Sequence, residues 1–271
     1  MDETVAGLPP EASSLPPGPM AQSVGRGAAA LSGATAATRG LSFLSQVVLG
    51  AVLVDRDFGL FAIANSIAGF IMALRDGGMQ TLIIQRGTAD YEELEGPAFW
   101  LGLVFNTLAG VLLAVVAPWI AGIYREPRLV PMLWIIAASI PLNSLAFVSL
   151  ARLRMDMRFG AVSTIDILSG VVRYGGMIVG ALAGLGALSF VVPFLAVAIL
   201  ESVAAYAFTR RTPWTRPFHP ERWRKLMAPS VWLIGSSLAG NALYMGSYMA
   251  LGLTASTALV GIYYFGYSFM Q

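Results

Sequence analysis

Arg39, Asp166, Arg173 and Glu201 are the residues of this sequence best placed to do chemistry, because each lies inside a long and otherwise apolar stretch. A charge at the centre of a bilayer costs about 2.5–3.5 kcal/mol on insertion scales, so such residues usually face a bundle interior or a wet cavity. Arg39 and Arg173 fall near the middle of their stretches, and Asp166 and Glu201 fall nearer one end. We predict a polar cavity in which Arg39 and Arg173 hold an anionic group such as a diphosphate, with Asp166 and Glu201 as further candidates.

An internal salt bridge is the alternative for two of these residues. Asp166 and Arg173 are seven positions apart, which is two helical turns, and therefore share one face of a helix. Paired with each other, or with Arg173 snorkelling toward the interface, they would stabilise the bundle without binding anything.

The uncharged polar residues of the apolar stretches are predicted to have structural roles. We expect hydrogen bonds between helices for four amides: Gln46, Asn65, Asn106 and Asn143. The small-residue stretches 32–40 and 235–240 are typical of close helix packing rather than of ligand binding.

Several kinds of chemistry are excluded by composition. The sequence has no cysteine, so disulfides, thiol catalysis and cysteine metal sites are ruled out. The one histidine, His219, lies in a polar stretch rich in arginine and proline, and no phosphate-binding loop or GxSxG motif occurs. We therefore predict that the protein is not an enzyme and uses no cofactor or metal. Its basic residues cluster beside apolar stretches, where membrane topology explains them better than nucleic acid does.

The elements that carry these residues are predicted to be transmembrane helices. The chain is 56% hydrophobic and 12% charged, whereas a soluble domain is about 25% charged. A helix needs about 20 apolar residues to cross a bilayer. Residues 98–124 and 129–151 each give one span, and residues 27–54 and 58–74 give two more. Residues 159–209 and 226–271 are long enough for two spans each, with turns expected at 180–188 and 252–257. The fold class is thus an all-α polytopic bundle of about eight spans.

Loop charges orient this bundle. Twelve basic residues fall in loops on the N-terminal side and three, Arg56, Arg125 and Arg128, on the other. Since short loops rich in Lys and Arg stay in the cytoplasm, the N-terminus is predicted to be cytoplasmic. The chain then divides into a disordered tail at 1–25, a six-helix lobe at 26–209, a basic cytoplasmic loop at 210–225 and the start of a second lobe at 226–271. Within the first lobe, the acidic run 90–96 is predicted to be a solvated loop, and 79–87 to lie along the interface.

Five motifs in order resemble one transporter family. LVDRDFGLFAIANSI (53–67) is similar to the L-x-P-x-D-F-G-x-x-A junction between the first two helices of bacterial polysaccharide and O-antigen flippases. These belong to the multidrug/oligosaccharidyl-lipid/polysaccharide superfamily. The others are RDGGMQTLIIQR (75–86), FWLGLVFN (99–106), IYREPRLVPML (123–133) and RLRMDMRFGAVSTIDILSGVV (152–172). The resemblance covers about residues 26–271, and it departs from the family where Asp55 and Arg56 stand in the region of the usual Thr-Pro.

The resemblance implies a function. Members of this family have about fourteen helices in two lobes around a central cavity, and carry a lipid-diphosphate-linked sugar repeat across the bacterial inner membrane by alternating access. It implies lipid-linked oligosaccharide and membrane lipid as partners, other polysaccharide-assembly membrane proteins as further ones, and a role in O-antigen or other lipopolysaccharide export. Because the chain stops inside the eighth span, it is expected to be the first lobe with the start of the second. Two alternatives remain open: a multidrug or small-cation exporter of the same superfamily, and a membrane fragment that transports nothing.

An internal similarity favours two related lobes. LVDRDFGLFAIANSI, after the first span, and LTASTALVGIYYFGYSF (253–269), after the seventh, each combine a short polar linker with a helix rich in glycine and aromatic residues. Both spans start on the same side, which is the geometry of a parallel repeat about an axis along the membrane normal.

Overall fold

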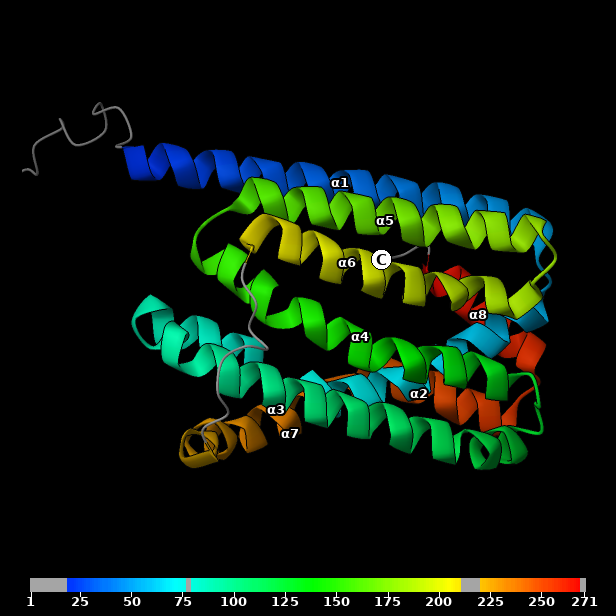
Figure 1. Cartoon of the computed structure of the whole chain (residues 1–271). Helices are drawn as coiled ribbons and strands as arrows, with labels where there is room; N and C mark the ends of the chain where they lie inside the picture. The colour runs from blue at the N-terminus through cyan, green and yellow to red at the C-terminus, as the bar shows by residue number, and fades with distance from the viewer. Residues whose placement is uncertain (1–18, 77–78, 211–219, 269–271) are drawn as a thin grey trace, which may run out of the picture.

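The protein is a bundle of long helices. The computed structural model describes residues 19–76, 79–210 and 220–268, and every regular element within these ranges is helical. Figure 1 shows the helices running side by side along one common direction. The elements are α1 (Pro19–Val52), α2 (Asp55–Asp76), α3 (Met79–Tyr124), α4 (Leu129–Met155), α5 (Phe159–Leu182), the 3₁₀ helix η1 (Gly186–Phe190), α6 (Val192–Thr209), α7 (Pro220–Thr254) and α8 (Thr257–Ser268). The predicted all-α class is confirmed.

Both turns predicted inside the long apolar stretches are confirmed. The first lies between α5 and η1, where Gly184 (φ +79°) and Gly186 (φ +55°) take left-handed backbone conformations. Glycine reaches these conformations without the steric cost that a Cβ imposes, so these residues allow the chain to reverse. The second lies between the end of α7 at Thr254 and the start of α8 at Thr257.

Three predicted boundaries differ from the structure. The loop predicted at 90–96 is wrong, because α3 continues through it and through Pro97. Charge suggested a loop, but glutamate is a good helix former, and one lost hydrogen bond at a proline need not end a long helix. Helix α1 begins at Pro19, inside the predicted tail 1–25, and α7 begins at Pro220, inside the predicted basic loop 210–225. The remainders of those two segments, 1–18 and 211–219, lie outside the described residues.

Four helical segments are long and apolar enough to cross a membrane, among the residues that the structure describes. They are Gly96–Tyr124, Leu129–Met155, Phe159–Leu182 and Gly186–Thr209. These coincide with four of the predicted spans, so the protein is a multi-pass membrane protein. The total of eight spans and the cytoplasmic N-terminus stay predictions.

The outward face of α3 fits a lipid environment. Large apolar side chains recur on it every three or four residues and are at least half exposed: Val104, Leu108, Val111, Leu112 and Val115. A soluble protein rarely exposes so long an apolar stripe, whereas a helix facing lipid tails must.

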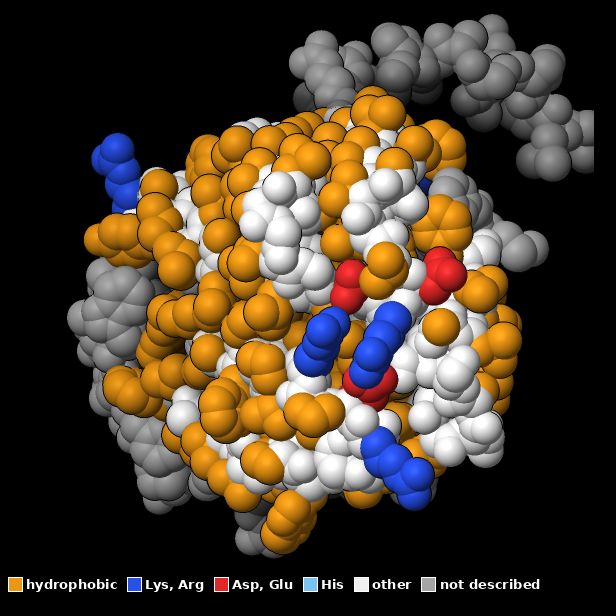
Figure 2. Space-filling model, turned by 90° about the vertical axis from the view of Figure 1, so that its right-hand side faces the viewer, with side chains coloured by type: hydrophobic (Ala, Val, Ile, Leu, Met, Phe, Trp, Pro, Cys, Tyr) orange, Lys and Arg blue, Asp and Glu red, His pale blue; other side chains and the backbone are white. Residues whose placement is uncertain are grey.

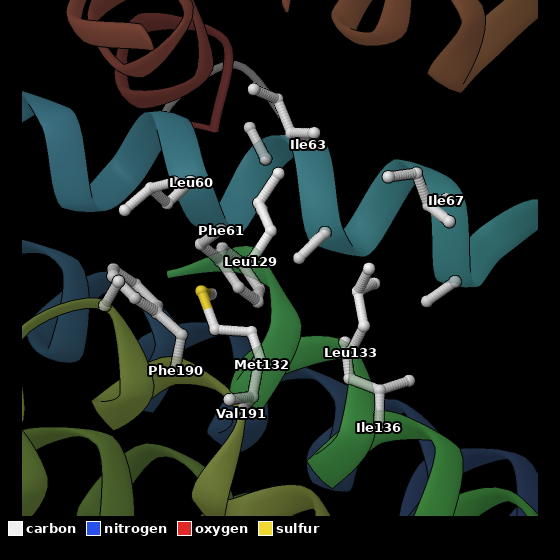
Figure 3. Close-up of a cluster of buried hydrophobic side chains, with 14 of the residues drawn as sticks. Leu60, Phe61, Ile63, Ile67, Leu129, Met132, Leu133, Ile136, Phe190 and Val191 are labelled. Atoms are coloured by element: carbon white, nitrogen blue, oxygen red, sulfur yellow. The ribbon is translucent and has the colours of Figure 1, made fainter. Parts of the chain in front are cut away.

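The centre of the bundle is packed around α2. Leu60, Phe61 and Ile67 of α2 belong to a buried cluster with the start of α4 and with η1 (Figure 3), whereas Ile63 lies on the other side of α2, against Gly252 of α7. The facing side chains on the other elements are Leu129, Met132, Leu133, Ile136, Phe190 and Val191. Helix α2 also packs on α7 and α8, while α1 packs along α5 and α3 along α4. Helix α2 therefore joins the predicted first lobe to the start of the second.

Four connections gather at one end of the bundle. The α1–α2, α3–α4, α5–η1 and α7–α8 connections all lie at the right-hand end of Figure 1. Figure 2 looks at this end and shows basic and acidic side chains close together, with hydrophobic side chains around them. We call it the junction end.

Candidate functional site

A cavity of about 870 Å³ lies between the first helices and the last. Its volume is within the range of about 300–1,000 Å³ that is usual for ligand sites. The walls come from α1 and α5 on one side and from α7 and α8 on the other, with α2 between them and η1 and α6 contributing one phenylalanine each. Its polar and charged lining residues are Thr38, Arg39, Ser42, Ser45, Gln46, Asn65, Ser66, Arg173, Tyr174, Asn241, Tyr248, Tyr264 and Tyr267.

Arg39 and Arg173 both line this cavity. They come from different helices, α1 and α5, which pack against each other along their length. A close contact sets their relative depth: a Cβ at Gly170, one turn before Arg173, would lie only 2.6 Å from the Cγ2 of Thr38. Thr38 is in turn fixed by the hydrogen bond that its hydroxyl donates to the carbonyl of Ala34, at 2.7 Å. The small residue on α5 thus lets α1 approach until the two arginines reach the same cavity.

Neither arginine is neutralised by a carboxylate within the described part of the chain. The ion pairs found there join Arg56 to Glu126 and Arg152 to Asp156. The Nε of Arg173 is buried without a hydrogen-bond partner, and the Cζ of Arg173 lies 5.7 Å from the ring centroid of Phe194. A buried guanidinium donor is costly to leave unpaired, so this group is suited to an anionic ligand.

Asp166 and Glu201 are not among the lining residues. The alternative of an Asp166–Arg173 salt bridge is not observed among the described residues, and the basic group whose charge acts on Asp166 is Arg154. Glu201 lies on α6, which contributes only Phe194 to the cavity. Of the four predicted site residues, the structure brings together the two arginines.

The hydrogen bonds between helices that were predicted for the amides are not made by Asn106 or Asn143. Asn106 and Asn143 donate to carbonyls of their own helices, those of Gly102 (2.6 Å) and Ser139 (3.0 Å), rather than across helices. Gln46 and Asn65 line the cavity.

The small-residue stretch 32–40 is both packing face and cavity wall: Ala34 is buried and Thr38 lies against Gly170 of α5, while the stretch 235–240 contributes Gly240 to the cavity. The glycines at positions 33, 40, 235 and 240 would meet no atom within 4 Å of an added Cβ in the described structure. Residues 38, 39 and 240 of these stretches line the cavity.

Four tyrosines were missed by the sequence reasoning. Tyr174, Tyr248, Tyr264 and Tyr267 line the cavity, three of them on the wall opposite the arginines. Tyrosine is common in membrane helices, and in isolation each of these fits a helix end or a packing contact. Only the observation that 264 and 267 share a face of α8 with each other, at helical spacing, could have drawn attention to them.

Glu126 connects three elements at the junction end. Its carboxylate accepts hydrogen bonds from Arg56 (Nη2 to Oε2 2.8 Å, Nε to Oε1 3.3 Å) and from the hydroxyl of Thr257 (2.7 Å). Arg56 is the second residue of α2, Glu126 lies between α3 and α4, and Thr257 is the first residue of α8. Burial opposes the charged form of Glu126, but the hydrogen bonds from Arg56 and Thr257 and the charges of Arg56 and Arg128 outweigh it, so the pKa of Glu126 is lowered.

Two glycines place the backbones of α2 and α8 in direct contact beside this carboxylate. A Cβ at Gly59 would collide with the carbonyl oxygen of Thr257, and a Cβ at Gly261 would collide with that of Asp55. The contact is reciprocal, with each glycine facing the first residue of the other helix. The parallel repeat predicted from the sequence would bring its two copies together in this way, and the repeat itself stays a prediction.

Comparison with known proteins places this geometry in a family. Residues 48–271 match the family described as Polysaccharide biosynthesis protein. The chain belongs to this family. It is 26% identical over 234 residues to the succinoglycan biosynthesis transport protein ExoT of Rhizobium meliloti, an alignment that covers 83% of this chain and 45% of that protein. It is 30% identical over 106 residues to the teichuronic acid biosynthesis protein TuaB of Bacillus subtilis, covering 39% of this chain and 22% of that protein. No solved structure matches.

The family membership confirms the resemblance found in the motifs. The family region includes Arg173, the junctions and the tyrosines, and Arg39 lies just before it. The chain spans less than half the length of the relatives that it matches. The family match and the four apolar helices together identify a multi-pass membrane protein of the polysaccharide biosynthesis family.

Proposed function

We propose that the protein translocates a lipid-diphosphate-linked oligosaccharide across the bacterial inner membrane, for export of polysaccharide or lipopolysaccharide. The observation that carries the proposal is the charge of the cavity: its described lining contains Arg39 and Arg173 and no carboxylate. A diphosphate is the anionic part of such a lipid, and guanidinium groups bind phosphate oxygens through paired, charge-assisted hydrogen bonds. The relative named for succinoglycan transport supports the same substrate class.

The movement that we propose is alternating access between two lobes. The cavity lies where helices of the predicted first lobe, α1 and α5, face helices of the second, α7 and α8. At the junction end, the contact between Gly59 and Gly261 leaves no room even for a methyl group between α2 and α8. Access from this end requires the two helices to separate, together with the bonds of Glu126 to Arg56 and Thr257. Rocking of one lobe against the other would do this while the cavity stays at mid-depth.

The charge of the cavity disfavours a multidrug or small-cation exporter. Such a site is expected to place acids at mid-depth, and the acids predicted within spans, Asp166 and Glu201, both lie outside the cavity lining.

Removing the two charges tests the proposal. The full-length protein is reconstituted into vesicles with a fluorescent polyprenyl-diphosphate oligosaccharide, and its movement between leaflets is followed with a membrane-impermeant quencher. Each of Arg39→Gln and Arg173→Gln should slow translocation at least tenfold, because a hydrogen bond to a charged group contributes about 1.5–3 kcal/mol. Arg154→Gln, an exposed arginine of α4 outside the lining, is the matched control and should keep the wild-type rate.

Three outcomes would overturn the proposal. Unchanged translocation by the Arg39→Gln/Arg173→Gln double variant would remove the cationic site. Export of a lipophilic fluorescent cation in place of the lipid would favour the multidrug reading. Movement of neither probe by the wild-type protein would leave a membrane protein that does not transport this class of lipid.

A further inference from the structure

Tyr248, Tyr264 and Tyr267 form a continuous aromatic surface on the cavity wall opposite the arginines. Tyr248 is 4% exposed, and its ring packs edge-to-face against Tyr264 (centroids 5.8 Å apart) and Tyr267 (6.4 Å). The three come from α7 and α8, which are the start of the predicted second lobe. We call these residues the tyrosine wall.

The hydroxyls of this wall have no partner in the part of the chain that the structure describes. Tyr248, Tyr264 and Tyr267 make no hydrogen bond to another described residue. Their hydroxyl oxygens are nevertheless not fully buried, so a molecule in the cavity can reach them. Tyr124, outside the cavity, shows the usual arrangement, since its hydroxyl donates to the carbonyl of Met249 at 3.3 Å. A half-buried tyrosine normally finds a hydrogen-bond partner. Unused hydroxyls that face a cavity are therefore available to a polar ligand.

Aromatic contacts connect the tyrosine wall to the arginines. Phe61 of α2 packs edge-to-face on Tyr264 (5.6 Å) and on Phe194 (6.5 Å), and the Arg173 guanidinium lies over Phe194 (5.7 Å). All four residues line the cavity. One ligand can thus contact the cationic wall and the tyrosine wall at the same time.

We propose that the tyrosine wall binds the sugar part of the substrate, next to the diphosphate held by Arg39 and Arg173. Sugar rings carry apolar C–H faces that pack on aromatic rings, and hydroxyls that exchange hydrogen bonds with a phenol, which is both donor and acceptor. The two lobes then divide recognition: the first binds the charged link, and the second binds the glycan. This inference rests on the proposed function.

Hydroxyl-removing variants test the inference with two probes in the same vesicle assay. One probe is polyprenyl diphosphate with an attached oligosaccharide, and the other is the same lipid diphosphate without sugar. The Tyr264→Phe/Tyr267→Phe double variant keeps both rings and removes two hydroxyls, so it should slow the glycan-bearing lipid about tenfold or more and leave the sugar-free lipid within about twofold, on the basis of about 1 kcal/mol for each neutral hydrogen bond. Tyr263→Phe removes a hydroxyl from the same helix at a position outside the lining, and should change neither rate.

The outcomes separate this inference from the proposed function. Equal slowing of both probes by the double variant, or slowing of neither, would overturn sugar recognition by the tyrosine wall while Arg39→Gln and Arg173→Gln still slow both lipids. Wild-type protein that moves neither lipid, or arginine variants that move both at the wild-type rate, would overturn the proposed function and this inference with it.

Discussion

The α1–α2 junction and the α7–α8 junction have the same backbone design and different chemistry. In both, a helix begins at the junction end and places a glycine four residues later, Gly59 after Asp55 and Gly261 after Thr257. The first junction carries Asp55, Arg56 and Asp57, and the second carries no charge. The shared feature, glycine, produces the reciprocal backbone contact.

The difference between the junctions shows which residues fix the helices and which connect them. Gly59 and Gly261 determine how closely α2 and α8 cross. Arg56 has no counterpart in the second junction and instead reaches Glu126 of the α3–α4 connection, which also accepts from Thr257. The glycines that recur in both junctions therefore set how closely α2 and α8 pack. Arg56, which occurs in the first junction alone, bonds to Glu126 and so helps to connect the predicted lobes.

Replacing Gly59 or Gly261 by a larger residue is expected to disrupt the contact between α2 and α8 and to lower stability more than any other change in this series. Gly59→Ala or Gly261→Ala places a Cβ against a carbonyl oxygen, and overpacking of this kind costs about 1–3 kcal/mol. The thermal unfolding midpoint of the full-length protein should fall accordingly. Because one separation of the helices relieves both collisions, the double variant should lose less than the sum of the two.

Gly266→Ala on α8 is the matched control for both glycines. No described atom lies within 4 Å of its added Cβ, so the substitution should be neutral or stabilise the helix by up to about 1 kcal/mol. If Gly59→Ala behaved like Gly266→Ala, the crossing would not be a tight contact.

Removing the charge of Glu126 is expected to have the next largest effect. Glu126→Gln leaves Arg56 without its carboxylate and weakens the bond from Thr257, while the glycine contact is untouched. We expect the unfolding midpoint to fall by about 2–4 °C, the scale on which modest destabilisation shows in a protein of this size. Asp156→Asn removes the carboxylate of the Arg152–Asp156 ion pair, whose members are four residues apart at the end of α4. This variant should shift the unfolding midpoint by less than about 1 °C. Equal shifts for the two variants would refute a special role of Glu126 between the lobes.

Lowering the pH should remove the stabilisation that the charged Glu126 carboxylate provides, without a mutation. The pKa of Glu126 is lowered in the folded protein from its ordinary value of 4.5. A lowered pKa means that the carboxylate stabilises the fold at pH values above about 4.5 and that this contribution is lost as the pH falls through the folded pKa. The difference in unfolding midpoint between wild type and Glu126→Gln should therefore shrink when the pH is lowered from 7 to about 3. A difference that stayed constant over this range would contradict the assignment.

Thr257→Val should have the smallest effect of the series. It removes a single hydrogen bond to a carboxylate that keeps its two bonds from Arg56, so we expect a loss of about 0.5 kcal/mol, at the lower end of the range for one hydrogen bond. Thr257→Ser retains the hydroxyl and should restore most of the wild-type midpoint. If serine and valine gave the same midpoint, the hydroxyl would be unimportant.

Sequence predicted the helices well because length, hydropathy and glycine turns are local properties. The reversals near Gly184 and between Thr254 and Thr257 are examples. The continuation of α3 through 90–96 was missed, since charge there is compatible with both a loop and a helix. The candidate arginines were found because a cation in an apolar stretch is unusual wherever it points.

What could not be predicted depends on contacts between distant segments. Arg39 and Arg173 share a cavity because Gly170 admits Thr38, and no local pattern of either helix specifies that pair. The tyrosines became candidates only when α7 and α8 were seen to face α1 and α5. The internal similarity drew attention to the segments that contain Gly59 and Gly261. That the two glycines lie against each other's helices was visible only once α2 and α8 were packed together.

The reciprocal contact also limits how this part of the molecule can vary. Most steric conflicts between helices can be relieved by a smaller side chain on the partner. At Gly59 and Gly261 the opposing atoms are backbone carbonyl oxygens, which every amino acid carries. No second-site substitution on the facing helix can make room, so a larger residue at either position forces the two helices apart.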